Sequence, residues 1–425
     1  MVEKELRGDI EPATQDSETQ QDFPETAAVR ASLQQFSSDK IGVLVHWGLY
    51  AKAGIVESWE LSDEDEWARG KSAFRPNMKQ LKQDYWGLNS GFDPQNFDPQ
   101  AWLRLFKHAG IRYLIFTTKH HDGFNLYDTQ FSDYKVGGTG SPYHGVDIFG
   151  ALVTSARQAG LKTGAYYSKA DWFHPDYWTK DDHPKSRHAD YVPTQQPERW
   201  QRYVDFVHAQ LRELASRYGG LSILWLDAGW VGAPREDLQL EQIAEEIRLL
   251  QPNILIVDRT RGGRFENYVT PERRIPSVDR LPTEVWESGL PLADNWGYVP
   301  HDHYKSLKQI ILSLLQVISL GGNLLLGVGP KPEGALPKQA IQRLTELGAW
   351  TSQNQEGIYG THAIEPIIFK RATKQEIYLT QDDQSYYLFV THPARDESNR
   401  IKVARYQTCG CSASSWGEGK CRFSH

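Results

Sequence analysis

The chain has 425 residues, 39% of them hydrophobic, and a formal net charge of -7. This composition predicts a globular protein with a large core and a small accessory domain. The mild acidity excludes a basic surface for phosphates, so nucleic acid is not expected as a partner. No apolar run is long enough to cross a bilayer, and residues 1–25 are polar and acidic, so neither a membrane span nor a signal peptide is expected in this chain.

The two ends of the chain differ in composition from its body. Residues 1–28 are rich in Gln, Glu, Asp and Thr and are predicted to be disordered. All three cysteines, Cys409, Cys411 and Cys421, lie near the C-terminus, so the body cannot depend on disulfides or thiolate metal sites. The tail that carries them has few strand-forming residues and is treated as an unnatural or truncated end.

Between these ends, apolar runs that predict buried strands alternate with amphipathic stretches that predict helices. The runs are branched, apolar and too short for helices, which is typical of strands buried on both faces. In chain order, strands are expected at 41–48, 112–119, 162–168, 223–227, 254–259 and 323–329, and helices at 31–36, 99–110, 147–160, 197–218, 237–250, 304–320 and 337–350. Residues 260–300 show no clean helix, and the sixth strand cannot be placed there.

Polar side chains recur at the carboxyl ends of these predicted strands, where parallel α/β barrels keep their chemistry. Asp227 ends one strand, His46 ends another, and Arg259 a third. Each also has a plain structural interpretation. Asp227 could cap the turn that follows it, His46 could be a satisfied core histidine, and Arg259 could pair with Asp227 or Asp258.

Adjacent histidines, His120 and His121, follow the second strand together with Asp122. Such a group could suggest a metal site. Adjacent residues on an extended chain point in opposite directions, however, and the sequence offers no His-x-His or acid-rich partner set, so no metal is expected. Neutral imidazoles that hold sugar hydroxyls fit better.

Aromatic and acidic residues complete the candidate site. The chain has 14 Trp and 20 Tyr, flat surfaces that suit the C–H faces of sugars but more often form plain core. Glu57 and Trp59 lie in a loop that suits either the rim of a sugar site or a solvated surface. Glu272 and Glu287 are two candidate acids within residues 260–300.

The predicted fold class is α/β, a distorted (β/α)8-like TIM barrel followed by a small antiparallel β-sandwich domain. Short alternating runs at 364–370, 376–380 and 386–391 indicate the second domain. The expected division is therefore a disordered segment at 1–28, a catalytic barrel at 29–350 and a C-terminal β domain at 351–425.

The order of the motifs resembles that of the α-L-fucosidases of glycoside hydrolase family 29. The resemblance spans residues 38–365 and is carried by His46-Trp-Gly, Lys119-His-His-Asp-Gly-Phe124, Tyr166-Tyr-Ser, Leu224-Trp-Leu-Asp227, Asp258-Arg, Thr270-Pro-Glu272, Trp286-Glu and Trp296-Gly-Tyr. It implies a retaining exo-glycosidase that removes terminal α-L-fucose from a fucosylated oligosaccharide or glycoconjugate. It implies no metal or organic cofactor, no membrane partner, and a periplasmic, secreted or lysosomal location. The oligomeric state stays open.

The resemblance also implies roles for single residues. Asp227 takes the place of the nucleophile, and the acid/base is Glu272 or Glu287, with Glu272 preferred. The substrate-binding residues implied are His46, Glu57, Trp59, His120, His121, Tyr167, Trp225, Arg259 and Trp296, although the spacing around Glu57 and Trp59 departs from the commoner pattern. An apolar wall for the 6-methyl group is expected from Trp225, Trp296 or Phe124.

A retaining mechanism requires two carboxyl groups about 5 Å apart, one ionised and one protonated, and an apolar setting of Glu272 or Glu287 would favour the protonated form. Three alternatives to an α-L-fucosidase stay open. They are a non-catalytic sugar-binding relative, another barrel glycosidase such as an α-galactosidase, and a metal-dependent hydrolase.

Overall fold

The computed structural model describes residues 26–69, 74–143, 147–181, 183–259, 265–364 and 377–390, and the backbone of 402–407. Within the barrel, seven strands form one parallel sheet in the spatial order β5-β4-β3-β2-β1-β7-β6. They are almost entirely buried, as their apolar sequences predict. Their bounds are β1 (Ile41–Val45), β2 (Tyr113–Lys119), β3 (Lys162–Ser168), β4 (Ile223–Asp227), β5 (Leu255–Asp258), β6 (Glu287–Pro291) and β7 (Asn323–Val328).

An irregular segment, residues 267–273, lies between the two edge strands of this sheet. On one side, the backbone N–H of Asn267 donates to the carbonyl of Ile256 in β5 at 2.9 Å. On the other side, Glu272 forms an isolated parallel bridge with Gly289 in β6. The ring of strands therefore closes through an eighth, irregular segment. Both this segment and the regular strand β6 lie within residues 260–300, where the sixth strand could not be placed from the sequence.

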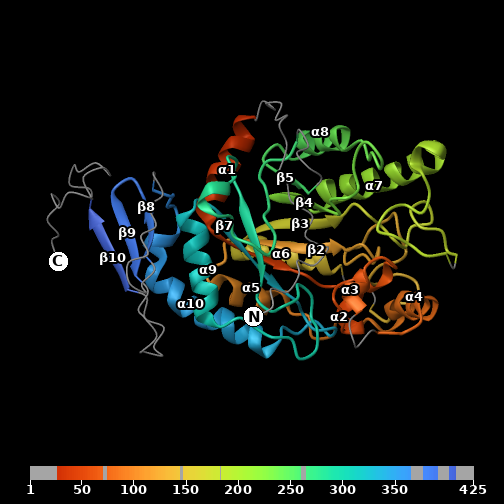
Figure 1. The fold of residues 1–425 in the computed structure, drawn as a ribbon, viewed down its shortest axis with the longest axis horizontal. Coiled ribbons are helices and arrows are strands. Elements are labelled where there is room, and N and C mark those ends of the chain that lie inside the picture. The colour runs from red at the N-terminus through yellow and green to blue at the C-terminus, as the bar shows by residue number, and fades with distance from the viewer. Residues whose placement is uncertain are drawn as a thin grey trace.

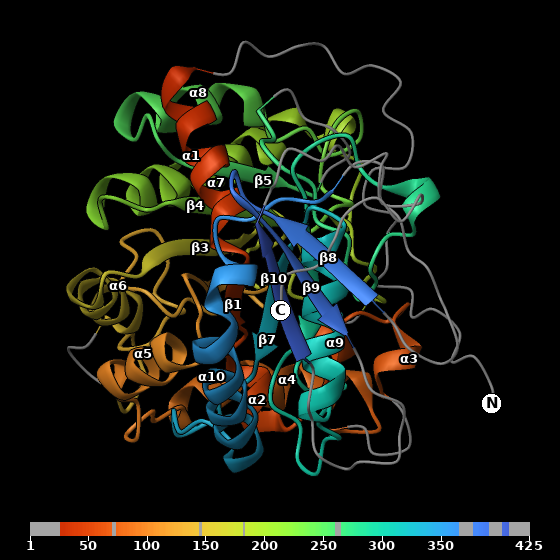
Figure 2. The same cartoon turned by 90° about the vertical axis from the view of Figure 1, so that its left-hand side faces the viewer.

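Helices cover the outside of the barrel, as Figures 1 and 2 show. Asp147 accepts from the backbone N–H of Gly150 at 2.9 Å and caps α6, and Gly160 ends that helix with φ 70°, as predicted. The alternating barrel is thus confirmed. The helices are α5 (Pro99–His108), α6 (Ile148–Ala159), α7 (Pro197–Arg217), α8 (Leu240–Leu250), α9 (Leu307–Ser319) and α10 (Lys338–Ile358).

Short elements follow β1 at the carboxyl end of the strands, on the right in Figure 1. They are α2 (Leu49–Ala53), the 3-10 turn η1 (Trp59–Leu61), α3 (Glu66–Arg69), α4 (Met78–Trp86) and η2 (Gly87–Gly91). Two further 3-10 turns are η3 (Pro193–Gln195) and η4 (Val278–Arg280).

Helix α1 (Ala27–Asp39) packs onto the interior of the barrel. Its apolar residues Val29, Leu33 and Phe36 belong to the same buried cluster as the inward side chains of the strands. The ring of Phe36 lies 5.1 Å from that of Tyr113, at the amino end of β2, and 4.4 Å from that of Tyr268. Figure 2 shows α1 crossing in front of the strands. The helix therefore covers the amino end of the barrel.

The start of α1 corrects part of the prediction for the N-terminus. Residues 1–25 of the segment predicted to be disordered lie outside the described residues. Residues 27 and 28 are helical, and the helix begins earlier than the expected 31–36 because Thr26 accepts a backbone hydrogen bond from Val29 at 3.2 Å as its N-cap.

The C-terminal part contains an antiparallel sheet of β8 (Ile377–Gln381), β9 (Ser385–Val390) and β10 (Lys402–Gln407). It packs on α10, where the ring of Phe389 lies 6.3 Å from that of Trp350. The antiparallel character is as predicted, but the described residues form one sheet against a helix rather than two facing sheets. In Figure 1 this sheet lies at the end of the molecule away from α2, α3 and α4.

Two other predictions for the C-terminal region concern residues that the structure does not describe, and a third concerns the end of α10. The expected strand at 364–370 and the three cysteines lie outside them. Helix α10 continues to Ile358, beyond the predicted end at Trp350, so the proposed boundary between the two domains falls within one helix.

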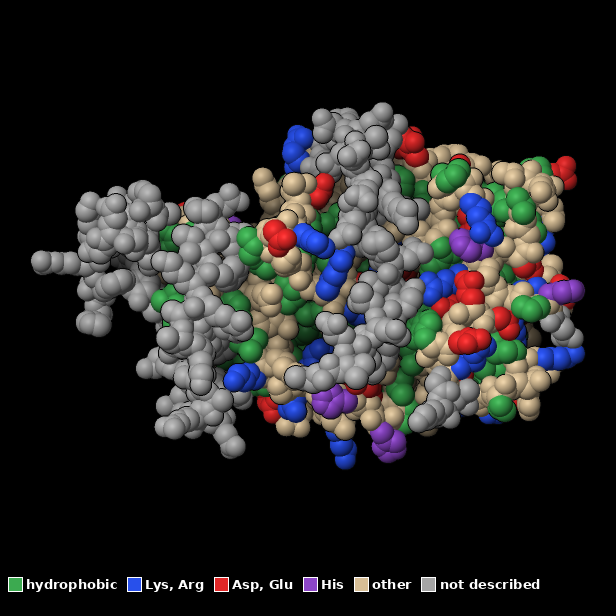
Figure 3. Space-filling model, viewed as in Figure 1, with side chains coloured by type: hydrophobic (Ala, Val, Ile, Leu, Met, Phe, Trp, Pro, Cys, Tyr) green, Lys and Arg blue, Asp and Glu red, His purple; other side chains and the backbone are tan. Residues whose placement is uncertain are grey.

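On the face shown in Figure 3, acidic and basic side chains are interspersed among polar and apolar ones. Among the described helices, none combines the length and the apolar character needed to pass through a bilayer.

The packing of α1 gives a test of this architecture. Replacing Phe36 by Ala removes a fully packed ring and leaves a cavity, so we expect the free energy of unfolding to fall by about 3–5 kcal/mol. Urea unfolding followed by tryptophan fluorescence measures the change. Leu249→Ala on α8 is the control, because Leu249 is 85% exposed and its loss should cost less than about 0.5 kcal/mol. Equal stability of Phe36→Ala and wild type would contradict the proposed role of α1.

Candidate active site

A pocket opens at the carboxyl ends of the strands. Ten of the twelve predicted site residues line it: the three candidate catalytic acids and seven of the nine predicted binding residues. The lining consists of Leu44, His46, Glu57, Trp59, His120, Tyr166, Arg187, Trp225, Asp227, Gly229, Trp230, Arg259, Thr270, Pro271, Glu272, Glu287, Gly289, Trp296 and Leu325.

Asp227 is the last residue of β4 and its carboxylate is held on both oxygens. Tyr166 on the neighbouring strand β3 donates its hydroxyl to Oδ2, and Nη1 of Arg259 donates to Oδ1 at 3.1 Å. Burial alone would raise the pKa of Asp227, but the charge of Arg259 and the Tyr166 hydrogen bond hold it below its ordinary value. Asp227 is therefore an ionised carboxylate, with a side chain 13% exposed.

Arg259 joins this carboxylate to a second one. Its Nη2 forms an ion pair with Oε2 of Glu272, which the irregular closing segment carries. Burial would lower the pKa of the guanidinium, but Glu272 and Asp227 together raise it. A single guanidinium thus contacts both carboxylates. The expected apolar setting for Glu272 is wrong, because a cation lies against it.

The residue after each of these carboxylates has a left-handed backbone. Ala228 has φ 69° and Arg273 has φ 53°. L-residues with a Cβ rarely adopt this conformation, and it costs of order 1–3 kcal/mol unless the surroundings impose it. Here it turns the chain sharply behind Asp227 and behind Glu272.

Trp296 fixes the other side of Glu272. Its Nε1 donates to Oε1 of Glu272 at 2.8 Å. The indole passes close to Gly327, where an added Cβ would lie 2.3 Å from the ring. The next residue, Gly297, donates its backbone N–H to Oε1 of Glu57 at 2.7 Å. The predicted residues Glu57, Glu272 and Trp296 are therefore coupled to one another.

The histidines are neutral, and two of them present a lone pair. The hydroxyl of Thr117 donates to the carbonyl of Val45, so its oxygen accepts from Nδ1 of His46 at 3.1 Å. This leaves Nε2 of His46 unprotonated. Burial lowers the pKa of His46 to about 3, which keeps the ring neutral.

His121 is also protonated on Nδ1, for the same reason as His46. Ser168 donates to the carbonyl of Ala170 and accepts from Nδ1 of His121 at 2.6 Å. The unprotonated Nε2 lies 3.9 Å from Oδ2 of Asp227. His120 is oriented through Nδ1, which lies 2.6 Å from the hydroxyl of Ser58. Burial holds the pKa of both rings well below the ordinary value.

His120, His121 and Asp227 also form a group whose ligand atoms lie within 4.8 Å of one another. Neutral imidazoles with a carboxylate could hold a metal ion. Two contacts oppose this use: Tyr166 and Arg259 already occupy both oxygens of Asp227, and the guanidinium would repel a second cation. The arrangement instead suits a hydroxyl group, which can donate to a lone pair and accept from a neighbour.

Glu287 lies at the opposite end of its strand from Asp227. It is the first residue of β6 and pairs in register with Asn323, the first residue of β7. The hydroxyl of Tyr113, the first residue of β2, donates to Oε2 of Glu287 at 2.5 Å. Burial raises the pKa of Glu287 to about 8, so it is a neutral acid in the floor of the pocket.

Tyr167, predicted to bind substrate, lies outside the pocket, and this prediction is corrected. Its hydroxyl donates to Gln210 of α7 at 2.8 Å and accepts from Lys119 at 3.0 Å. Side chains alternate along a strand, so Tyr166 points inward where Tyr167 points to the helices. Phe124, a candidate for the apolar wall, packs 5.3 Å from Phe92, whereas Trp225 and Trp296 do line the pocket.

Arg187 and Trp230 line the pocket although neither was predicted to belong to the site. Trp230 comes three residues after Asp227, so its place beside the strand end was a usable signal. Arg187 belongs to the irregular insertion after β3, and nothing in its local sequence distinguishes it.

A parallel barrel whose strand ends carry two carboxylates, neutral histidines and indoles in one pocket is the arrangement of a glycoside hydrolase. Comparison with known proteins narrows this class. A family model described as Alpha-L-fucosidase matches residues 10–356. An α-L-fucosidase from Dictyostelium discoideum is 27% identical over 349 residues, 76% of this chain and 70% of the relative.

Solved structures agree with the family match. α-L-Fucosidase isoenzyme 1 from Paenibacillus thiaminolyticus superposes with a TM-score of 0.70 at 32% identity, covering 87% of this chain and 85% of the other. Thermotoga maritima α-fucosidase in complex with fucose gives 0.68 at 29% identity, covering 84% and 82%. The chain belongs to the α-L-fucosidase family of glycoside hydrolases.

The buried state of Glu287 makes stability depend on pH. Its pKa is about 8 in the folded protein against 4.5 for an ordinary glutamate. Between these values the folded protein keeps a proton that the unfolded chain has released, so stability falls as pH rises through this window. Glu287→Gln cannot ionise and still accepts from Tyr113. We therefore expect the variant to gain stability relative to wild type between about pH 5 and pH 8, measured by urea unfolding. A difference that stays constant with pH would contradict a neutral Glu287.

Proposed function

We propose that this protein is a retaining exo-α-L-fucosidase that hydrolyses terminal α-L-fucose with Asp227 as nucleophile and Glu272 as acid/base. The observation that carries the proposal is the pair of carboxylates held in one pocket by Arg259. Membership of the α-L-fucosidase family supports the substrate class, as does the Thermotoga maritima relative in complex with fucose.

The shape of the pocket supports removal of a terminal sugar. Leu44, Leu325 and the neutral Glu287 lie in its inner lining, and α1 covers the barrel beneath. A sugar can therefore enter only from the carboxyl end of the strands. A single residue at the end of a glycan fits such a blind pocket, whereas the middle of a chain does not.

In the first step, Asp227 attacks the anomeric carbon and the bond to the leaving oxygen breaks. Its ionised state, maintained by Arg259 and Tyr166, is what a nucleophile requires. The transition state has oxocarbenium character, which a carboxylate on one face stabilises before it forms the glycosyl ester. Water then hydrolyses the ester with retention of configuration.

Glu272 protonates the leaving oxygen in that step and activates the water in the second. An acid that gives up a proton cannot at the same time be held as a carboxylate by Arg259. We therefore expect that the bound sugar separates Glu272 from the guanidinium of Arg259. Arg259 then stays paired with Asp227 alone. The Nε1 of Trp296, 2.8 Å from Glu272, keeps the acid oriented at the wall.

The unprotonated ring nitrogens of the histidines can accept hydrogen bonds from the hydroxyl groups of the sugar. Nε2 of His46, which lines the pocket, accepts from a sugar hydroxyl. His121, like Tyr167, is not part of the lining, but its Nε2 lies 3.9 Å from Oδ2 of Asp227, which suits a hydroxyl adjacent to the reacting carbon. The indoles of Trp225 and Trp296 offer an apolar wall to a methyl group. A hydroxymethyl group there would lose its hydrogen bonds to water, which disfavours galactose.

The nucleophile is tested by Asp227→Ala. We expect kcat on p-nitrophenyl α-L-fucoside to fall by more than about a thousandfold, because no carboxylate remains to trap the anomeric carbon. Azide or formate should restore part of the rate by occupying the vacated space. Wild type should also hydrolyse the fucoside much faster than p-nitrophenyl α-D-galactoside. Activity of Asp227→Ala close to wild type would remove Asp227 from the mechanism.

The acid is tested by comparing Glu272→Ala with Glu287→Ala on two leaving groups. A poor leaving group needs protonation and a nitrophenolate does not, so Glu272→Ala should lose about 10²–10⁴-fold on a fucosyl disaccharide and far less on the nitrophenyl fucoside. Glu287→Ala should affect both substrates alike. The reverse pattern would transfer the role of acid to Glu287.

A further inference from the structure

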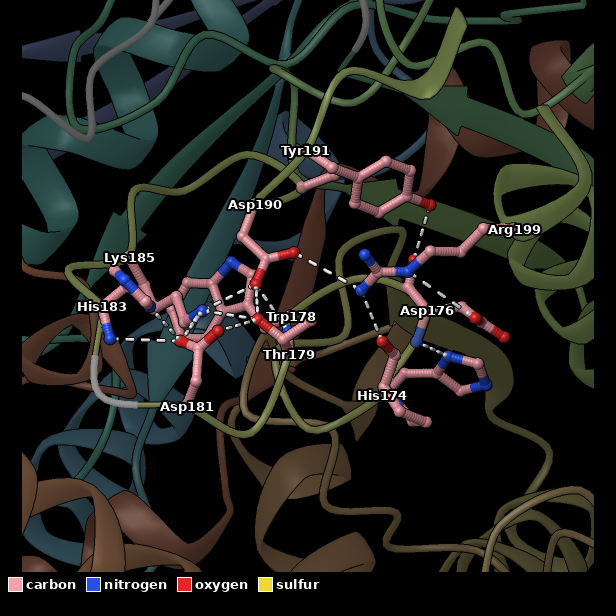
Figure 4. A network of polar contacts seen from close by, with 12 residues as sticks. His174, Asp176, Trp178, Thr179, Asp181, His183, Lys185, Asp190, Tyr191 and Arg199 are labelled. Carbon is pink, nitrogen blue, oxygen red and sulfur yellow. Dashed lines mark hydrogen bonds and ion pairs between the residues drawn. The ribbon is translucent and has the colours of Figure 1, made fainter. Parts of the chain in front are cut away.

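In the insertion after β3, the described residues 171–181 and 183–193 are tied together by polar contacts around Lys185 (Figure 4). Lys185, with a side chain only 3% exposed, donates to Thr179 at 2.9 Å, Asp181 at 2.7 Å and Asp190 at 2.6 Å. Arg199 of α7 adds a contact to Asp190 at 3.4 Å. A buried ammonium with three oxygen partners makes this irregular loop a fixed structure rather than a loose connection.

The same insertion is fastened to the segment that carries η1 and α3. The backbone N–H of Lys185 donates to the carboxylate of Asp63 at 2.7 Å, and its carbonyl accepts from the N–H of Asp63 at 2.8 Å. Two segments more than a hundred positions apart in the sequence are thus held in register. Arg187 comes two residues after Lys185 and lines the pocket.

The backbone of Arg187 takes part in four hydrogen bonds. Its carbonyl accepts three hydrogen bonds, from Nε1 of Trp172 at 3.1 Å, the hydroxyl of Tyr177 at 2.9 Å and Nε1 of Trp230 at 2.9 Å. Its own N–H donates to Glu64 at 2.9 Å. The backbone of this residue is therefore fixed from four sides.

The side chain is held as well. Asp65, almost fully buried, accepts from Nε and Nη2 of the guanidinium. The guanidinium lies 4.7 Å from the ring centre of Trp59 and 5.6 Å from that of Trp230, within cation–π range. All three side chains line the pocket. The result is a rigid wall of a guanidinium and two indoles that are tilted by 58° to each other, which we call the Arg187 wall.

The Arg187 wall belongs to the open part of the pocket. Side chains deep in the pocket, such as Leu44 at 2% and Leu325 at 1%, are nearly inaccessible, whereas the side chain of Arg187 is 13% exposed, as is that of Asp227 at the strand end, and Trp230 is half-buried. A sugar bound in the pocket points its glycosidic oxygen to the opening, because the remainder of the glycan lies outside. The next sugar therefore passes the Arg187 wall.

We propose that the Arg187 wall is the binding subsite for the sugar to which the terminal residue is attached. The ring of that sugar stacks on Trp230, and Arg187 donates a hydrogen bond to one of its oxygens, a hydroxyl or an acetamido carbonyl. The carboxylate of Asp65 neutralises the guanidinium, so an uncharged acceptor is favoured over an anionic group. This inference rests on the proposed fucosidase activity and adds the leaving-group side of its specificity.

The test compares a substrate that reaches the wall with one that cannot. The leaving group of α-L-fucosyl fluoride is a single atom, whereas that of a fucosyl disaccharide is a whole sugar. For Arg187→Gln we expect kcat/KM on the disaccharide to fall about tenfold or more and kcat/KM on the fluoride to stay within about twofold of wild type. Arg187→Lys, which keeps the charge but loses the flat fork, should give an intermediate loss on the disaccharide.

Arg212→Gln is the matched control, since Arg212 forms an exposed pair with Glu246 on the helices and should leave both substrates unaffected. Retained turnover of the fluoride shows that the variants fold. An equal loss on both substrates would mean that Arg187 serves the terminal sugar or the shape of the pocket, and no loss on the disaccharide would mean that the wall binds nothing. Either result overturns the subsite. Wild type that releases fucose from neither substrate would instead refute the proposed function itself.

Discussion

The guanidinium of Arg259 is the interaction on which the site depends. Two carboxylates in one buried pocket repel each other, and each would lose much of its hydration. A cation between them offsets both effects, and its flat shape fixes where each carboxylate can lie. Removing Arg259 would leave two buried carboxylates without a cation, which is far more costly than the loss of an exposed ion pair, whereas removing either carboxylate would leave the other paired with Arg259.

The barrel explains how three such residues meet. Asp227 ends β4, Arg259 follows β5, and these strands are neighbours in register, so their tips are adjacent without any special loop. Glu272 arrives by another route, on the irregular segment that completes the ring. The ion pairs among Asp227, Arg259 and Glu272 therefore connect the strands β4 and β5 to the irregular segment that closes the barrel.

Much of this could be predicted from the sequence, because strand tips in a parallel barrel converge. His46, Asp227 and Arg259 follow clear apolar runs, and their common location follows from that pattern alone. The caps of α6 were equally readable in Asp147 and Gly160. The pattern does not show which way a side chain faces when two tyrosines are adjacent, and the resemblance pointed to Tyr167 where the strand register turns Tyr166 inward.

Other features depend on contacts between distant parts of the chain, which no local pattern encodes. The neutral state of Glu287 results from burial beneath the pocket, which outweighs the opposing effect of the hydrogen bond from Tyr113 on its pKa. The place of Arg187 results from hydrogen bonds that its carbonyl accepts from Trp172, Tyr177 and Trp230. The irregular closing segment escaped prediction because a strand held by isolated bridges needs neither alternation nor a continuous apolar run.

That segment has an evolutionary consequence. A residue within a regular ladder cannot shift by one position without turning to the opposite face, so the location of Asp227 is locked to its neighbours. Glu272 is attached to the ring by only a few backbone contacts and is under no such restriction. Insertions or deletions near Glu272 can therefore move the proposed proton donor along the sequence while the proposed nucleophile, Asp227, stays in place, so related chains can carry the two carboxylates at different spacings.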